Sequence, residues 1–139
     1  MSLFSVMQIA GTALAAQTVR LNTTASNMAN ADSTASSVGG TYRARSPVFQ
    51  AIANNEWDAD ESSAMGVKVA GIVESQAPLR REYQPGNPLA DKEGYIFLPN
   101  VNTVEEMANM IEASRSYQTN VEILDASKQM LMRTLALGQ

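Results

Sequence analysis

Residues 4–28 of the chain read FSVMQIAGTALAAQTVRLNTTASNM, and the spacing of apolar residues in this stretch decides the fold. Apolar or small side chains recur at alternating steps of three and four residues from Phe4 to Met28. The larger members of this stripe lie seven residues apart and are Met7, Leu14, Leu21 and Met28. A repeat of 3.5 residues keeps such a stripe facing one partner helix. We therefore predict a helix from about residue 3 to residue 28.

The other faces of this predicted helix carry almost no charge. Arg20 is the one charged residue in the stretch. A helix face exposed to water normally carries Lys and Glu, whereas small uncharged residues let other helices approach closely. We infer that other helices surround this one in its working state. Arg20 is then either a buried ion-pair partner between subunits or a surface arginine whose stem lies on apolar neighbours.

A second long helix is predicted from Thr103 to the end of the chain. Thr103 and Glu106 have the spacing of a capping box, in which each side chain satisfies the free backbone amide of the other residue. A second apolar stripe follows, with seven-residue spacing and two intervening members: Met110, Tyr117, Leu124 and Leu131, with Val121 and Leu135. Pairing the two helices as a coiled coil hides both stripes.

Between the predicted helices the sequence changes to turn residues and short extended runs. Positions 29–42 are rich in Asn, Ser and Gly, which favour turns over helix. Extended runs follow at residues 66–73, 80–83 and 95–98. We predict a mainly α chain with a small β-rich insert, of the α+β class. Its parts are an N-terminal helix (1–34), a β-rich middle domain (35–102) and a C-terminal helix (103–139).

Asn27 and Asn30 mark the end of the first predicted helix. Asparagine can cap backbone groups at a helix end or accept a left-handed conformation there. It can equally make contacts between subunits. The sequence leaves both roles open for this pair of residues.

Composition argues against catalysis. The 139-residue chain has neither histidine nor cysteine, and its formal net charge is −4. The usual general base near neutral pH, the thiolate nucleophile and the common zinc ligands are therefore missing. An acidic balance gives no electrostatic reason to bind nucleic acid. We predict no catalytic, cofactor-binding or metal site and no small-molecule substrate, and we expect protein partners.

The densest acidic run lies at residues 56–61. Its members are Glu56, Asp58, Asp60 and Glu61, with Trp57 between the first two. Calcium ligands or paired catalytic carboxylates are one interpretation. The run lacks the glycine and the distal glutamate of a calcium loop, so a solvated loop is the favoured one.

Residues 1–19 carry no charged side chain, which raises the possibility of a leader or a membrane anchor. No basic segment precedes the apolar stretch, and polar residues such as Ser5, Gln8 and Gln17 interrupt it. We predict no cleaved signal peptide and no membrane span.

Several strings of the sequence resemble the flagellar basal-body rod protein family. They are IAGTAL (9–14), RLN (20–22), ASNMANAD (25–32), GVKV (66–69), ESQAP (74–78), PGNPLAD (85–91) and SRSYQ (114–118). The asparagine-rich string is typical of the whole family, and the middle strings narrow the resemblance to its proximal-rod members. One departure is that residues 32–35 lack the Thr-Pro-Gly-Tyr turn seen in many members.

The resemblance implies a structural subunit that assembles helically into the rod and transmits torque from motor to hook. It implies export through the flagellar type III apparatus without a cleaved leader, assembly in the periplasm, and copies of itself and other rod proteins as neighbours. The alternatives are another flagellar axial protein, a soluble coiled-coil adaptor, or an enzyme with a concave pocket.

Overall fold

The computed structural model describes residues 3–53 and 64–137. In chain order its elements are α1 (Leu3–Ala29), the 3₁₀ helix η1 (Val38–Gly40), β1 (Arg45–Ala53), β2 (Ala64–Glu74), β3 (Arg80–Tyr83), β4 (Tyr95–Leu98) and α2 (Thr103–Leu137). The predicted first helix and the start of the second are confirmed. Two long helices with a small β-rich middle also confirm the α+β class, whereas the coiled-coil geometry of the helix pair stays a prediction.

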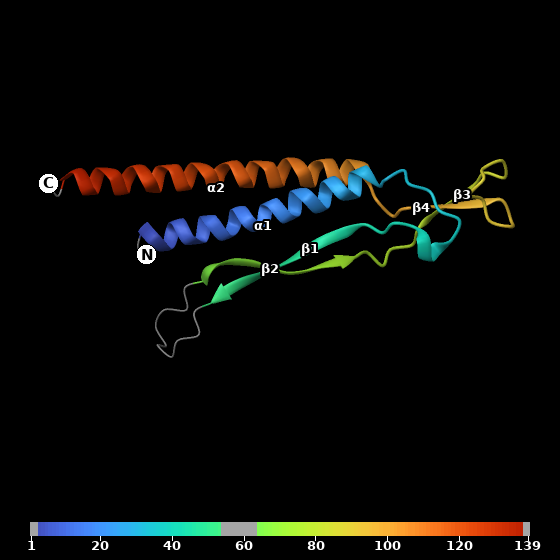
Figure 1. Cartoon of the computed structure of the whole chain (residues 1–139), viewed down its shortest axis with the longest axis horizontal. Coiled ribbons are helices and arrows are strands. Elements are labelled where there is room, and N and C mark those ends of the chain that lie inside the picture. Colours follow the sequence, from blue (N-terminus) through green and yellow to red (C-terminus); the bar gives the residue numbers. More distant parts are fainter. Residues whose placement is uncertain (1–2, 54–63, 138–139) are drawn as a thin grey trace.

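The elements form an elongated stack (Figure 1). The two helices run antiparallel, so both chain ends lie at the same end of the molecule, and the β1–β2 ribbon lies along α1 on the side away from α2. The β3–β4 hairpin lies at the opposite end from the termini. At about 1.5 Å per residue, the 27 residues of α1 and the 35 of α2 span roughly 40 and 52 Å. The final turns of α2 therefore extend past the start of α1.

The β1–β2 ribbon is antiparallel, pairing Arg45 with Glu74 at one end and Ala53 with Ala64 at the other. The sequence prediction missed β1, because Pro47 interrupts its pattern. Proline is tolerated in a two-stranded ribbon, where each strand has an open edge. The ribbon meets α1 at Gly66, which has a φ of +146° and whose missing side chain leaves space that Thr12 occupies. The Val67 amide donates to Thr12 Oγ1 at 3.2 Å.

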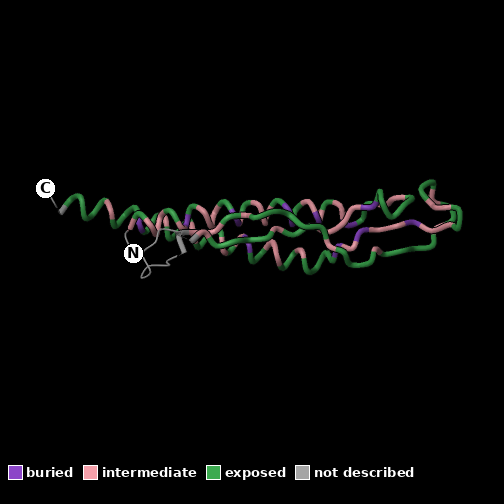
Figure 2. The backbone as a smooth tube through the Cα atoms, turned by 90° about the horizontal axis from the view of Figure 1, so that it is seen from below, coloured by how far each residue is buried: buried purple, intermediate pink, exposed green. Residues whose placement is uncertain are grey.

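The core is thin and built mainly from small side chains. The buried apolar residues are Ala10, Ala16, Ala31, Ile96, Pro99, Val101 and Ala113, and the buried polar ones are Thr23, Thr24, Asn27, Thr41 and Ser127. Figure 2 shows buried positions as short stretches scattered along the molecule. The accessible surface is 9668 Å², whereas a compact monomer of 14.9 kDa exposes about 7,000 Å². The chain alone therefore leaves much surface uncovered.

The start of α2 differs from the predicted capping box. Asn102 caps the helix, because its Oδ1 accepts from the Val104 amide at 3.2 Å. The Glu106 carboxylate accepts instead from the Asn27 side chain at 2.9 Å, across to α1. The capping-box pattern located the helix start within one residue, but it assigned Glu106 to the wrong partner.

Candidate assembly interface and joint

The two helices are joined along their shared length by a polar contact. Arg20 of α1 donates to Glu112 of α2 at 3.1 Å and to Asn109 at 3.2 Å. The Arg20 side chain is 22% exposed and that of Glu112 is 66% exposed. The sequence offered an intersubunit or a solvated role for Arg20. The structure shows a third one, an ion pair within the chain.

The predicted helix-packing residues fall into two groups. Seven of them are half-buried, namely Met7, Leu14, Leu21, Met28, Met110, Leu124 and Leu131. The other four are exposed, namely Phe4 and Leu135, at 72% and 70%, and Tyr117 and Val121. Phe4 and Leu135 lie at the free end of the helix pair, where the stack is least covered. Whether these eleven residues pack against neighbouring subunits stays a prediction.

Helix α2 also exposes apolar side chains outside the predicted stripe. They are Val104, Met107, Ile111, Ile123, Met130 and Met132, each at least 40% exposed. Val104, Met107 and Ile111 follow one another at steps of three and four, so they share one helix face. We call these three residues the outer patch. Their spacing is visible in the sequence, but the prediction used only the seven-residue stripe, which lies on another face of the helix.

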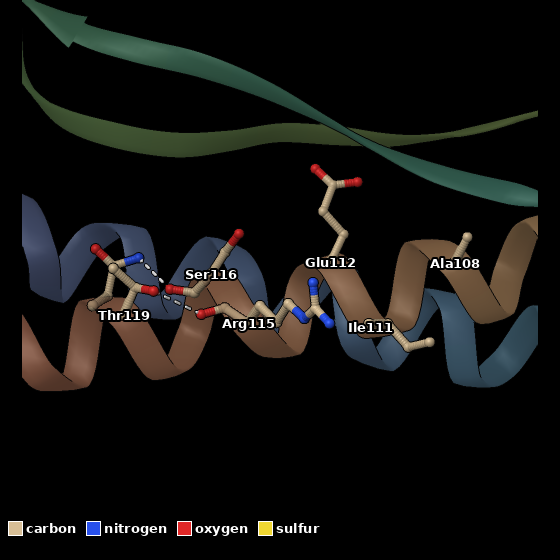
Figure 3. A pocket seen from close by; sticks show the side chains of 7 residues that line it. Ala108, Ile111, Glu112, Arg115, Ser116 and Thr119 are labelled. Carbon is tan, nitrogen blue, oxygen red and sulfur yellow. Dashed lines mark hydrogen bonds between the residues drawn. The ribbon is translucent and has the colours of Figure 1, made fainter.

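A shallow groove runs along α2 beside the outer patch (Figure 3). Its lining residues are Ala108, Ile111, Glu112, Arg115, Ser116, Thr119 and Asn120. The Thr119 hydroxyl donates to the Arg115 carbonyl and the Asn120 amide to the Ser116 carbonyl, both within the helix. Glu112 is engaged by Arg20. The side chains of Thr119, Asn120 and Glu112 therefore already have partners within the chain.

The asparagines at the end of α1 have different roles. Asn30 is half-buried, and its Nδ2 donates to the Ser26 carbonyl of its own helix at 2.8 Å. This is a local helix-end contact. Asn27 is 1% exposed and reaches across the fold instead.

Asn27 lies where the two helices and the β1–β2 ribbon meet. We call Asn27 and its partners Tyr42, Arg45 and Glu106 the joint. Its Nδ2 donates to Glu106 Oε1 at 2.9 Å and to the Arg45 carbonyl at 2.8 Å. Its Oδ1 accepts from the Tyr42 hydroxyl and from the Arg45 amide, both at 2.9 Å. An asparagine side chain has two donor hydrogens and an acceptor oxygen with two lone pairs, and all are used here. The joint therefore ties together α1, β1 and α2.

Further polar contacts extend the joint toward the β3–β4 hairpin. Asn100 Oδ1 accepts from the Ala44 amide at 2.8 Å, and its Nδ2 donates to the Ala77 carbonyl at 2.9 Å. Arg80 donates to the Pro99 carbonyl and to the Ala31 carbonyl, at 3.2 and 3.1 Å. Backbone carbonyls thus serve as the main acceptors, and the hairpin is fixed to the end of the helix pair.

The part of the chain that the structure describes contains neither a metal-binding cluster nor a membrane-spanning helix. Residues 3–53 and 64–137 contain no cluster of three His, Cys, Asp or Glu side chains that could hold a metal ion. Among the same residues, neither helix combines the length and the apolar character needed to cross a bilayer. The acidic run at 56–61 and Trp57 lie outside the described residues.

Comparison with known proteins matches two family models. One is described as flagella basal body rod protein and covers residues 7–35. The other is described as the C-terminal part of the flagellar basal body rod FlgEFG proteins and covers residues 92–137. The two matches fall on α1 with the following turn and on β4 with α2, which are the segments that the joint holds together.

Whole-chain relatives give the same result. The chain is 52% identical over 139 residues to the flagellar basal-body rod protein FlgC of Salmonella typhimurium strain LT2, with both chains fully covered. It is equally similar to FlgC of Escherichia coli O6:H1. A FlgC protein of Borreliella burgdorferi is 38% identical over 151 residues, covering all of this chain and 99% of the relative.

Proposed function

The chain belongs to the flagellar basal-body rod protein family and is a structural subunit of that rod, and from this premise we propose that it forms part of the proximal rod. The proposal rests on the full-length similarity to FlgC proteins together with the middle strings of the sequence. The neighbours are further copies of the chain and other rod proteins.

The observation that carries the proposed mechanism is the apolar surface left open on the helix pair. The outer patch, Phe4 and Leu135 are all exposed, and the first helix has a single charged residue. Exposed apolar surface of this kind, here at both ends of the helix pair, marks a protein contact site. Neighbouring helices in the rod cover it, and we propose that the two helices then pack as a coiled coil within a tube.

Head-to-tail contacts between identical subunits produce a filament when the rotation does not close. Helices aligned with the tube axis make such a filament stiff, because closely packed side chains resist compression. Torque from the motor passes to the hook through this packing. Catalysis has no part in this mechanism, and the relatives named above are described as rod proteins.

We further propose that the chain reaches the periplasm through the flagellar type III export apparatus with its N-terminus uncleaved. The support is physical. Residues 3–28 form nearly all of α1, one of the two paired helices. They include Asn27, the central residue of the joint. Removal of this segment as a leader would take away α1 and the contacts that hold the ribbon and α2.

The test is the structure of basal bodies isolated from cells that lack this chain. We expect ring components without a complete rod, and restoration of the rod when the full-length chain is supplied. An intact rod in the deletion strain would contradict the proposed function. Mass spectrometry of the restored rods should find the N-terminal peptide, and its absence would contradict uncleaved export.

A further inference from the structure

The apolar seam of the helix pair does not by itself define how far α1 sits along α2. Met7, Leu14, Leu21 and Met28 are similar in size and lie seven residues apart. A slip of seven residues, about 10 Å along the axis, places a Met or Leu again at three of these four positions. Of the fully buried side chains of α1, the apolar ones are alanines, and Asn27 is the largest.

Polar contacts discriminate strongly, because they are lost completely when the helices slip. Asn27 donates to Glu106 at 2.9 Å in a site where Asn27 is 1% exposed. A slip would leave the Asn27 amide and the Glu106 carboxylate without this bond, and an unpaired buried polar group is costly. The second contact between the helices, from Arg20 to Glu112, lies in the same register but is more exposed.

We propose that the Asn27–Glu106 pair is the register lock of the helix pair. Asn27 lies beside the seam, one residue before Met28, and a polar residue at a helix–helix seam can fix register at some cost in stability. Its bonds to Tyr42 and Arg45 couple the register of the helices to closure of the ribbon.

The lock determines what the far end of the pair presents. With Asn27 near the end of α1 held against Glu106 near the start of α2, the longer helix must project beyond the shorter one. The projecting turns carry Leu131, Met132 and Leu135, the last two of them 63% and 70% exposed. Resting on the proposed function, we infer that this projection contacts the next subunit along the rod. The length of the projection is then set by the Asn27–Glu106 pair, which lies at the opposite end of the molecule.

Distance measurements on the full-length chain test the lock. The chain has no cysteine of its own. Nitroxide labels therefore react only with the two cysteines introduced by Gln8→Cys and Asp125→Cys. Both positions are exposed, and the antiparallel register places them at about the same level. Pulsed electron resonance should give one narrow distance distribution. In Asn27→Asp, a carboxylate faces the Glu106 carboxylate, and the distribution should broaden or move to longer distances as the two labels slip apart along the axis by about 5 Å per helical turn.

A reversed pair separates the lock from general damage. In Asn27→Asp with Glu106→Gln, the new amide can donate to the new carboxylate, so most of the narrow distribution should return. Asn30→Asp is the matched control, because Asn30 donates within its own helix, and it should leave the distance unchanged. An unchanged distribution in Asn27→Asp would overturn the proposal. A double variant as broad, or as unfolded, as the single one would overturn it too.

The same variants distinguish the lock from its use in the rod. The register is measured on the purified chain, without other rod proteins. If the double variant regains the native distance but cells carrying it build no rod, the inferred use of the projecting end is contradicted while the lock stands. If register and rod assembly fail and return together, both are supported.

Discussion

Glu106 at the joint and Ile111 in the outer patch are five residues apart on α2, yet their surroundings differ completely. Five residues rotate a side chain by about 140° around the helix axis, so the two point to different sides. Glu106 accepts from a buried asparagine that uses all its hydrogen-bonding capacity. Ile111 is 56% exposed.

The difference shows which part of the subunit is complete within one chain. The joint satisfies its polar groups internally and fixes the relative positions of α1, α2 and the ribbon. The outer patch holds apolar side chains that the chain does not cover. We infer that a rigid, self-sufficient joint orients surfaces that neighbouring subunits complete.

The largest effect is expected from a charge in the outer patch. Ile111→Asp should abolish rod formation and swimming, because assembly would bury an unpaired carboxylate. The free chain should keep its stability within about 0.5 kcal/mol, since the site is exposed. Swimming in soft agar and urea unfolding followed by circular dichroism measure the two effects. Gln118→Asp is the matched control, adding the same charge at another exposed position of α2. Normal swimming of Ile111→Asp would refute the role of the patch.

A change in the joint should have the opposite effect to a change in the outer patch, because it should lower the stability of the free chain. Asn27→Ala leaves Glu106, Tyr42 and the Arg45 backbone without their shared partner. The free chain should lose about 2–4 kcal/mol of unfolding free energy, since several buried groups become unpaired. Denaturant unfolding of the purified chain gives this value. Asn30→Ala removes one local bond and should cost about 1 kcal/mol or less. Equal losses in the two variants would remove the distinction between joint and helix end.

A change at the contact between the ribbon and α1 should cause an intermediate loss of stability. Gly66→Ala places a methyl group against Thr12 at a backbone angle that residues with side chains rarely adopt. A loss of about 1–3 kcal/mol is expected. Adding Thr12→Ala should recover the steric part and leave the part due to the backbone angle, once Thr12→Ala alone has given the cost of the lost Val67–Thr12 hydrogen bond. A thermal unfolding series on the three variants measures both parts, and an unaffected Gly66→Ala would contradict the close approach.

The smallest effect is expected at the partly exposed ion pair. Arg20→Gln should cost less than about 1 kcal/mol, because water and salt screen the Arg20–Glu112 attraction. The difference between the variant and the unsubstituted chain should shrink further as salt is raised. Unfolding at low and at high ionic strength checks this. A loss as large as that of Asn27→Ala would place the main lock at Arg20.

Sequence reasoning predicted the long elements well because their signals are repeated many times. The seven-residue stripe gave the first helix with bounds of about 3 to 28, and the structure has Leu3–Ala29. The strands at 80–83 and 95–98 were also predicted correctly. β1 was missed, since a proline within a short run masks the strand pattern and open-edge pairing is visible only in three dimensions.

The joint was the least predictable part, for a physical reason. Asn27 was singled out, but its partners lie 15 to 79 positions away in the chain. No local pattern shows that the Asn27 side-chain amide will bond to Glu106. The capping-box pattern instead pairs the Glu106 side chain with the Thr103 backbone amide. Similarly, Arg20 was recognised as unusual, but its pairing with Glu112 depends on the register of two distant helices. The assembly role of the helix-packing residues and the boundaries at 34/35 and 102/103 stay predictions.

The central claim is that neighbouring subunits enclose the exposed faces of the helix pair. Cysteine accessibility at Ile111→Cys tests it most directly, provided that this variant still swims. Maleimide labelling is compared in the free chain, in intact basal bodies and in basal bodies denatured as a reference for full reaction. We predict rapid labelling of the free chain and the denatured sample, and protection in the intact rod. Labelling of the intact rod as fast as the free chain would contradict the account.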